Sequence, residues 1–220
     1  MKPFENGENG SNGKNAMDEI LAYLTEKYEP VGMIVYGSFA DGTNGLNSDF
    51  DALLVYRGSE SLHDSSFVNG TELDVFVYPE SLFEGEYDVR DFLQLRDGRI
   101  LADETGIVAA LKEKVCAFID GYAGKSREEN EQNLAWCEKM LQRTKRNDME
   151  GAFRLHWLLV DSLEIYTDLK GTFYPGPKKA IRQMCDTDPD SASIYCRALK
   201  EPTEENLTCW IRWLRSMGAS

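Results

Sequence analysis

Residues 31–55 read VGMIVYGSFADGTNGLNSDFDALLV. An apolar strand leads into Gly37 and Ser38, which predict a tight turn. After a loop of small residues, a second apolar strand opens with Asp49 and Asp51. Residues i and i+2 of a strand share one face, so the two carboxylates project together. Such a pair repels unless a cation lies between its members, and magnesium with a polyphosphate is the usual reason to build one.

A third acid follows on a later strand. Asn69-Gly70 predicts a hairpin turn, and the strand after it, residues 71–78, places Asp74 on the face opposite to the apolar residues. If this strand pairs beside the strand of Asp51, Asp74 joins the acidic pair. The alternative is two solvent-facing acids and an unrelated third, because a short Asp-x-Asp motif often occurs by chance. The turn, the loop length and the third acid together favour a two-metal site for phosphoryl or nucleotidyl transfer.

The order of these elements resembles the signature of the nucleotidyltransferase superfamily, which includes DNA polymerase beta and kanamycin nucleotidyltransferase. That signature is Gly-Ser, a loop, Asp-x-Asp, and a third Asp on a later strand. The spacing from Gly37 to Asp49 is similar to that of the minimal and antibiotic-modifying branches, and the chain most resembles the kanamycin/lincosamide nucleotidyltransferase-like branch with its C-terminal helical domain. Those branches often carry a basic residue where this chain has Asp41. The resemblance is specific over about residues 30–80.

The resemblance implies a site for two magnesium ions and for ATP or another nucleoside triphosphate. The implied metal ligands and catalytic acids are Asp49, Asp51 and Asp74. Ser38 and the backbone N–H groups around Gly37 would hold the β- and γ-phosphates, since glycine lets the backbone approach closely. The implied nucleotide-binding residues of this segment are Gly37, Ser38 and Ser48.

The chain divides into an α/β (α+β) domain and an all-α domain. We expect a flexible N-terminus over residues 1–14, and a nucleotidyltransferase domain with a small mixed sheet over residues 15–104. Residues 105–220 predict a helical bundle that binds the acceptor. The first domain is expected to hold a helix over 15–28, a strand ending at 36, strands near 50–56, 72–78 and 99–102, a loop over 58–68 and a short helix over 88–95.

One predicted helix of the second domain, from about Met149 to Lys170, carries acids on one face. Residues 157–160 are apolar all round, which predicts a central helix. Asp161, Glu164 and Asp168 follow at i, i+3 and i+7. In kanamycin-nucleotidyltransferase-like enzymes a carboxylate from the helical domain deprotonates the acceptor hydroxyl, so the resemblance implies Glu164 or Asp161 as the base. The alternative is a solvated face with helix salt bridges.

Two lysines follow a Pro-Gly-Pro turn. Lys178 and Lys179 would neutralise triphosphate charge, or they are ordinary surface lysines. A capping box at Ser126 predicts the start of another helix, and Gly171 predicts the end of the helix that begins at Met149.

Charge and composition limit the classes of molecule that the protein is expected to bind. The net charge of −14 and the pI near 4.6 disfavour nucleic acid as a partner and favour a cationic acceptor, although an acidic surface is more often a solubility feature. No run approaches the ~20 apolar residues of a membrane span, and residues 1–15 lack the apolar core of a signal peptide. With five cysteines and no Cys-x-x-Cys spacing, we expect a cytoplasmic protein with reduced thiols. A homodimer is a further expectation.

The favoured function is transfer of a nucleoside monophosphate, AMP from ATP, to a hydroxyl of a small molecule such as an aminoglycoside- or lincosamide-like antibiotic. One alternative is a protein-modifying or toxin–antitoxin type of nucleotidyltransferase, although minimal enzymes of that type usually lack an extended helical domain on the same chain. Another is a non-catalytic nucleotide-binding module, which the intact acid triad disfavours.

Overall fold

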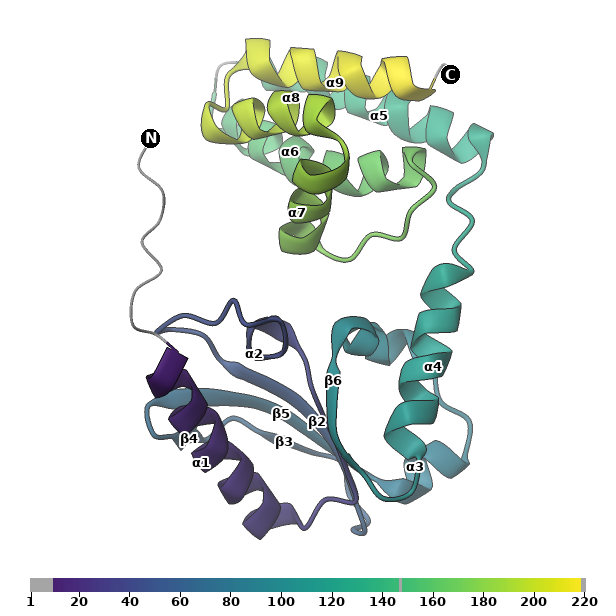
Figure 1. The fold of residues 1–220 in the computed structure, drawn as a ribbon. Helices are drawn as coiled ribbons and strands as arrows, with labels where there is room; N and C mark the ends of the chain where they lie inside the picture. The colour runs from purple at the N-terminus through teal and green to yellow at the C-terminus, as the bar shows by residue number, and fades with distance from the viewer. Residues whose placement is uncertain (1–9, 147, 219–220) are drawn as a thin grey trace. The chain divides into compact units, whose positions relative to one another are not determined.

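The computed structural model describes residues 10–146 and 148–218 (Figure 1). Contacts divide the chain into two compact units, the first ending at Ile119 and the second beginning at Asp120.

The first unit contains a mixed six-stranded sheet, as predicted. Its strand order is β3-β5-β2-β1-β6, with β4 paired to β5. β2 and β5 run parallel, and the other pairs are antiparallel. The elements are α1 (Gly10–Tyr28), β1 (Gly32–Val35), α2 (Gly37–Asp41), β2 (Phe50–Tyr56), β3 (Leu62–Asp64), β4 (Phe67–Val68), β5 (Thr71–Pro79), α3 (Glu80–Glu84), the 3-10 helix η1 (Val89–Asp97), β6 (Arg99–Asp103) and α4 (Ile107–Asp120).

Helices cover the sheet on both faces, with α1 on one side and α4 on the other (Figure 1). On the α1 face, Ile20 and Leu24 are buried against alternate residues of the strands. The strand residues of that face are Met33, Val35, Phe50, Ala52, Leu54, Leu73, Val75 and Val77. Because side chains alternate along a strand, Asp51 and Asp74 lie on the opposite face.

Three expectations for this unit need correction. α1 begins at Gly10, so residues 10–14 are helical rather than flexible; the rest of the predicted flexible segment lies outside the described residues. The segment 58–68 contains β3 and β4 instead of a loop, because both short strands pair with β5. The helix predicted over 88–95 is the 3-10 helix η1. The Asn69-Gly70 turn is confirmed: both residues have positive φ, 49° and 83°, and they join β4 to β5.

The edge strand β3 is attached to α1 through a buried carboxylate. Asp64 accepts hydrogen bonds from Lys27 Nζ at 2.9 Å and from the Tyr28 hydroxyl at 2.8 Å. The backbone N–H of Ser66 donates to the other carboxylate oxygen at 3.0 Å. Burying a charge is costly unless it is paired and hydrogen-bonded, and Asp64 is both. This network holds a strand that has few apolar side chains of its own.

Replacing Asp64 by Asn is expected to lower the free energy of unfolding by about 2 kcal/mol, because the buried acceptor loses the charge that strengthens its hydrogen bonds. Urea unfolding followed by circular dichroism measures the change. Asp18→Asn, which removes an exposed carboxylate from the same helix α1, is the matched control and should change stability little. Equal stability of the two variants would contradict a stabilising role for Asp64.

The same network makes stability depend on pH. Burial alone would raise the pKa of Asp64, but hydrogen bonds from Ser66, Lys27 and Tyr28 outweigh it and hold the pKa below its ordinary value. A depressed carboxyl pKa stabilises the fold above the unfolded pKa, near about pH 4, and this stabilisation is lost as the pH falls through the folded pKa. Below about pH 4 the wild type should therefore lose stability more steeply than Asp64→Asn.

The second unit is a helical bundle, which confirms the predicted all-α region. Its helices are α5 (Arg127–Thr144), α6 (Met149–Leu169), α7 (Pro177–Thr187), α8 (Pro189–Lys200) and α9 (Glu204–Gly218). Ser126 caps α5 in a capping box with Glu129, as the sequence predicts. The bundle core gathers around the fully buried Trp210, whose indole N–H donates to the Ser162 hydroxyl at 2.9 Å.

The contact boundary lies after Ile119, whereas the sequence placed it near residue 104. The reason is that α4 belongs to the first unit. Its Lys112 Nζ donates to the Gly98 carbonyl at 2.6 Å, and its Val108 packs so closely on β1 that a Cβ at Gly32 would lie 2.5 Å from it.

The apolar residues 157–160 do not all face the bundle core. Leu158 and Leu159 are buried, but Trp157 is 42% and Val160 57% exposed. A helix has one inward stripe, and in α6 the leucines occupy it. Trp157 instead contacts two neighbouring rings, Phe153 at 5.9 Å and Trp136 at 6.0 Å between centroids.

Candidate active site

Three carboxylates converge where β2 begins. Asp49 precedes β2, Asp51 lies within it, and Asp74 is the direct partner of Asp51 on the parallel strand β5. One carboxylate oxygen of each lies within 4.8 Å of the others. Asp49 is exposed and the other two are half-buried, so the cluster faces solvent at one side. The structure therefore brings together the three acids that the sequence singled out.

The Gly37 backbone lies directly against this cluster. Gly37 has φ of 64°, and a Cβ built on it would lie 2.0 Å from Asp51 Oδ2. Only glycine permits both this backbone conformation and this approach. The Tyr36 N–H also donates to the Asp51 carbonyl at 3.0 Å, which joins the turn to the start of β2. The turn and the acids thus form one packed arrangement.

The loop between the turn and the acids is shaped by its own hydrogen bonds. α2 begins at Gly37, and its N-cap residue, Tyr36, makes no side-chain capping hydrogen bond. Ser38 lies in that turn and is half-buried. The Ser48 hydroxyl accepts a hydrogen bond from the Gly45 N–H at 2.9 Å, so Ser48 organises the loop just before Asp49. The nucleotide-binding roles of Gly37, Ser38 and Ser48 stay predictions.

Asp41, the departure from the family pattern, is used within the loop. Its Oδ1 accepts from the Thr43 N–H at 3.0 Å and from the Thr43 hydroxyl at 2.6 Å. Asp41 therefore stabilises the end of α2, at a position where the minimal and antibiotic-modifying branches often carry a basic residue.

Two side chains beside the acids were missed at the sequence level. Tyr36 is buried, and its pKa is raised by burial and then by the charges of Asp74 and Asp51, so its phenol stays protonated next to the cluster. His63 Nε2 lies 2.7 Å from Asp74 Oδ1. His63 falls in the segment expected to be a loop, so nothing in the sequence placed it beside β5.

The acids of α6 take different positions within the second unit. Asp168 is buried, accepts a hydrogen bond from the Tyr122 hydroxyl, and has Lys125 Nζ at 2.6 Å from its Oδ2. This pairing makes Asp168 a structural residue. Glu164 is exposed and lies 3.4 Å from Lys125 Nζ. Asp161 is half-buried, and burial raises its pKa, with a smaller contribution from the charge of Glu164; a hydrogen bond from Trp157 acts in the opposite direction.

The other predicted residues of the second unit lie in the first turn of α7. Lys178 is exposed and Lys179 half-buried. Their role toward a triphosphate stays a prediction.

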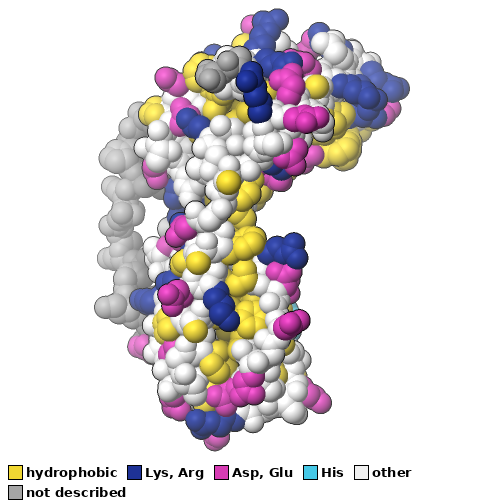
Figure 2. Space-filling view, turned by 90° about the vertical axis from the view of Figure 1, so that its right-hand side faces the viewer, with side chains coloured by type: hydrophobic (Ala, Val, Ile, Leu, Met, Phe, Trp, Pro, Cys, Tyr) yellow, Lys and Arg dark blue, Asp and Glu magenta, His cyan; other side chains and the backbone are white. Residues whose placement is uncertain are grey.

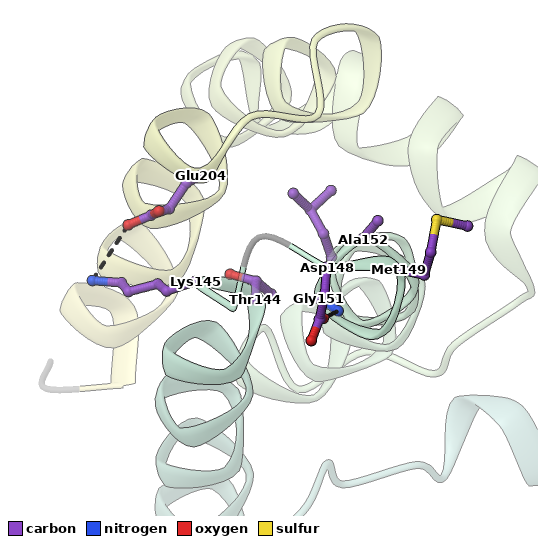
Figure 3. Close-up of a pocket in the computed structure, with 8 residues that line it drawn as sticks. Thr144, Lys145, Asp148, Met149, Gly151, Ala152 and Glu204 are labelled. Atoms are coloured by element: carbon purple, nitrogen blue, oxygen red, sulfur yellow. Dashed lines mark hydrogen bonds and ion pairs between the residues drawn. The ribbon is translucent and has the colours of Figure 1, made fainter.

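A hollow of about 820 Å³ lies at the turn between α5 and α6. Figure 3 draws the residues that line it. Its lining residues are Thr144, Lys145, Asp148, Met149, Gly151, Ala152, Leu155 and Glu204. Lys145 Nζ lies 3.3 Å from Glu204 Oε1 across this hollow. The described lining residues include none of the predicted acids or lysines, so the hollow gives no support to an assignment as the acceptor site.

The acid cluster fits a divalent cation. Carboxylate oxygens are the ligands that magnesium prefers, and three of them within 4.8 Å of one another would repel strongly without a cation. The start of α2 lies beside the acids through the Gly37–Asp51 contact, and backbone N–H groups at such a turn suit a polyphosphate. A mixed sheet that carries such a cluster is compatible with phosphoryl- or nucleotidyl-transfer chemistry.

A family model for the nucleotidyltransferase domain matches residues 17–142, more than half of the chain. The chain therefore belongs to the nucleotidyltransferase domain family and is a nucleotidyl-transferring enzyme, which confirms the superfamily resemblance. A search of curated proteins gives no match.

Among solved structures, the chain is similar to a nucleotidyltransferase-like protein from Exiguobacterium sibiricum 255-15. The two share 15% sequence identity with a TM-score of 0.39, over 95% of this chain and 75% of that chain. Within residues 10–146 and 148–218, no helix is both long and apolar enough to cross a membrane.

Proposed function

We propose that the protein transfers AMP from ATP to a hydroxyl group of a small molecule, with magnesium as the cofactor. The observation that supports this proposal most directly is the convergence of Asp49, Asp51 and Asp74 beside the Gly37-Ser38 turn. The family assignment gives nucleotidyl transfer, and the three acids supply a place for the metal ions that such transfer uses.

Asp49, Asp51 and Asp74 would hold two magnesium ions, which offset phosphate charge and lower the pKa of the acceptor hydroxyl. The N–H groups at the start of α2 and the Ser38 hydroxyl would donate hydrogen bonds to the β- and γ-phosphate oxygens. Lys178 and Lys179 would add positive charge toward the triphosphate.

The transfer forms a bond between the acceptor oxygen and the α-phosphorus and breaks the bond from that phosphorus to the pyrophosphate oxygen. The proton of the acceptor hydroxyl goes to a carboxylate of α6, either Glu164 or Asp161. Two facts support different choices. Glu164 is the more exposed, whereas the raised pKa of Asp161 brings it closer to neutral pH, where a general base works best.

The charge of the chain supports a small and cationic acceptor over a nucleic acid. The net charge is −14. On the face drawn in Figure 2, the basic side chains of the first unit are separated by acidic and apolar ones. Nucleic acids are usually bound by contiguous basic surface, which neutralises several phosphates at once. The negative electrostatic potential of the protein attracts cations, so we expect an acceptor that is a hydroxylated small molecule with amino groups.

Incubation of the purified protein with ATP labelled at the α-phosphate, magnesium and a panel of hydroxylated small molecules is the direct test. We expect label on a small molecule, and no transfer when EDTA removes the metal. Label on a polypeptide would instead establish the protein-modifying alternative. Nucleotide binding without transfer to any acceptor would show a non-catalytic module and overturn the proposal.

A further inference from the structure

His63 contacts the acid cluster without being one of its three carboxylates. It lies on β3, opposite Phe76 of the antiparallel neighbour β5. Its Nε2 is 2.7 Å from Oδ1 of Asp74, which lies two residues before Phe76 on the same face of β5. A carboxylate that binds a metal is ionised and only accepts hydrogen bonds, so Nε2 is the donor whether the imidazole is neutral or charged.

The imidazole is held in this orientation by ring stacking. Its centroid lies 4.5 Å from that of Phe76, with 12° between the ring planes. Phe76 in turn stacks on Tyr78 with 9° between the planes. The strand that carries His63 is fixed from the other side, because the neighbouring residue Asp64 is buried and bound to α1. The donor therefore has a defined position before any ligand arrives.

We propose that His63 is a positioning residue for the metal site. It fixes the rotamer of Asp74 through Oδ1 and reserves Oδ2 of that carboxylate for the metal ion. This inference rests on the proposed function, in which Asp74 is a metal ligand. Hydrogen bonds to ligating carboxylates orient the ligand, and their loss typically lowers metal affinity about 10- to 100-fold.

If His63 had a purely structural role, its replacement would lower the unfolding midpoint. The His63 and Asp74 side chains are 50% and 40% exposed, and exposed pairs of this kind contribute little to stability. We therefore expect replacement of His63 to leave the unfolding midpoint nearly unchanged. Metal affinity, measured without turnover, distinguishes the two roles.

The probe is Mn²⁺, whose free concentration is read by electron paramagnetic resonance during titration of the full chain. His63→Phe keeps an aromatic ring to stack on Phe76 but removes the donor, and we expect a dissociation constant raised about 10- to 100-fold. His63→Gln loses the ring but places an amide N–H near the position of Nε2, and it should recover most of the affinity. His156→Gln is the matched control, because it removes the other, exposed histidine.

The outcomes separate this inference from the proposed function. Wild-type affinity in His63→Phe, with binding lost in Asp74→Asn, would overturn the positioning role and leave the metal site intact. An equal loss in His63→Gln and His63→Phe would also overturn it, because stacking rather than donation would then matter. A wild type that binds no Mn²⁺ would overturn the proposed function itself. Circular dichroism melts confirm that each variant is folded.

Discussion

Asp49→Asn is expected to reduce turnover by about 10³-fold or more, which corresponds to about 4 kcal/mol of transition-state stabilisation. The substitution keeps the shape of the side chain but removes one of the three charges that would hold the metal ions. The fold should persist, because Asp49 is exposed and belongs to no strand or helix. Initial rates of label transfer at saturating magnesium and ATP measure the effect.

The control for this variant is Asp18→Asn, which removes an exposed carboxylate from α1, the helix on the other face of the sheet. Asp18→Asn should keep wild-type turnover. An Asp49→Asn protein with wild-type activity in magnesium would contradict the assignment of Asp49 as a metal ligand. Matching circular dichroism spectra of the two variants would exclude unfolding as the cause of lost activity.

Gly37→Ala should abolish most of the activity although it removes no charge, because the added methyl group clashes with Asp51. The new Cβ would lie 2.0 Å from Asp51 Oδ2 and 2.8 Å from its Cγ, so the carboxylate must move. A displacement of about 1 Å in a catalytic group can cost about 100-fold in rate, which sets the expected loss. The positive φ of 64° adds about 1 to 2 kcal/mol of backbone strain. Turnover and thermal unfolding, measured on the same sample, report the two effects.

Gly42→Ala separates strain from displacement. Gly42 ends the same helix with φ of 74°, but a Cβ there would meet nothing within 4 Å. It should therefore show a similar loss of stability with nearly normal turnover. If both variants lost activity equally, the contact between Gly37 and Asp51 would not be the reason for glycine at position 37.

The acid triad could be predicted because each part of it follows from local rules. Alternation along the extended segment that enters β2 predicts that Asp49 and Asp51 share a face, and the Asn69-Gly70 turn predicts the start of β5. Only the pairing of β5 with β2 joins segments that are distant in the sequence. The apolar residues that alternate with Asp74 favour this pairing, because they need a buried sheet face. The Ser126 capping box defined the start of α5 in the same local way.

The failures of prediction have a common cause, which is long-range packing. β3 carries a charged buried residue, Asp64, so its sequence lacks the apolar alternation by which strands are recognised. His63 was missed with it. In α6, apolar residues occur on both the inner and the outer face, and only the packed bundle shows that Leu158 is inside and Trp157 partly outside. The contact boundary after Ile119 differs from the one placed near residue 104, because the contacts of α4 with β1 are not visible in the sequence of α4.

The parallel pairing of β2 with β5 sets Asp51 directly beside Asp74. A slip of a single residue would turn the Asp74 carboxylate toward α1 and bury it among apolar side chains, which is prohibitively costly. A register error would thus bury a charge in the core and would also separate the carboxylates of Asp51 and Asp74. A cation that needs both carboxylates recognises only the correctly assembled sheet, so its binding energy adds to the cooperativity of folding of the whole first unit.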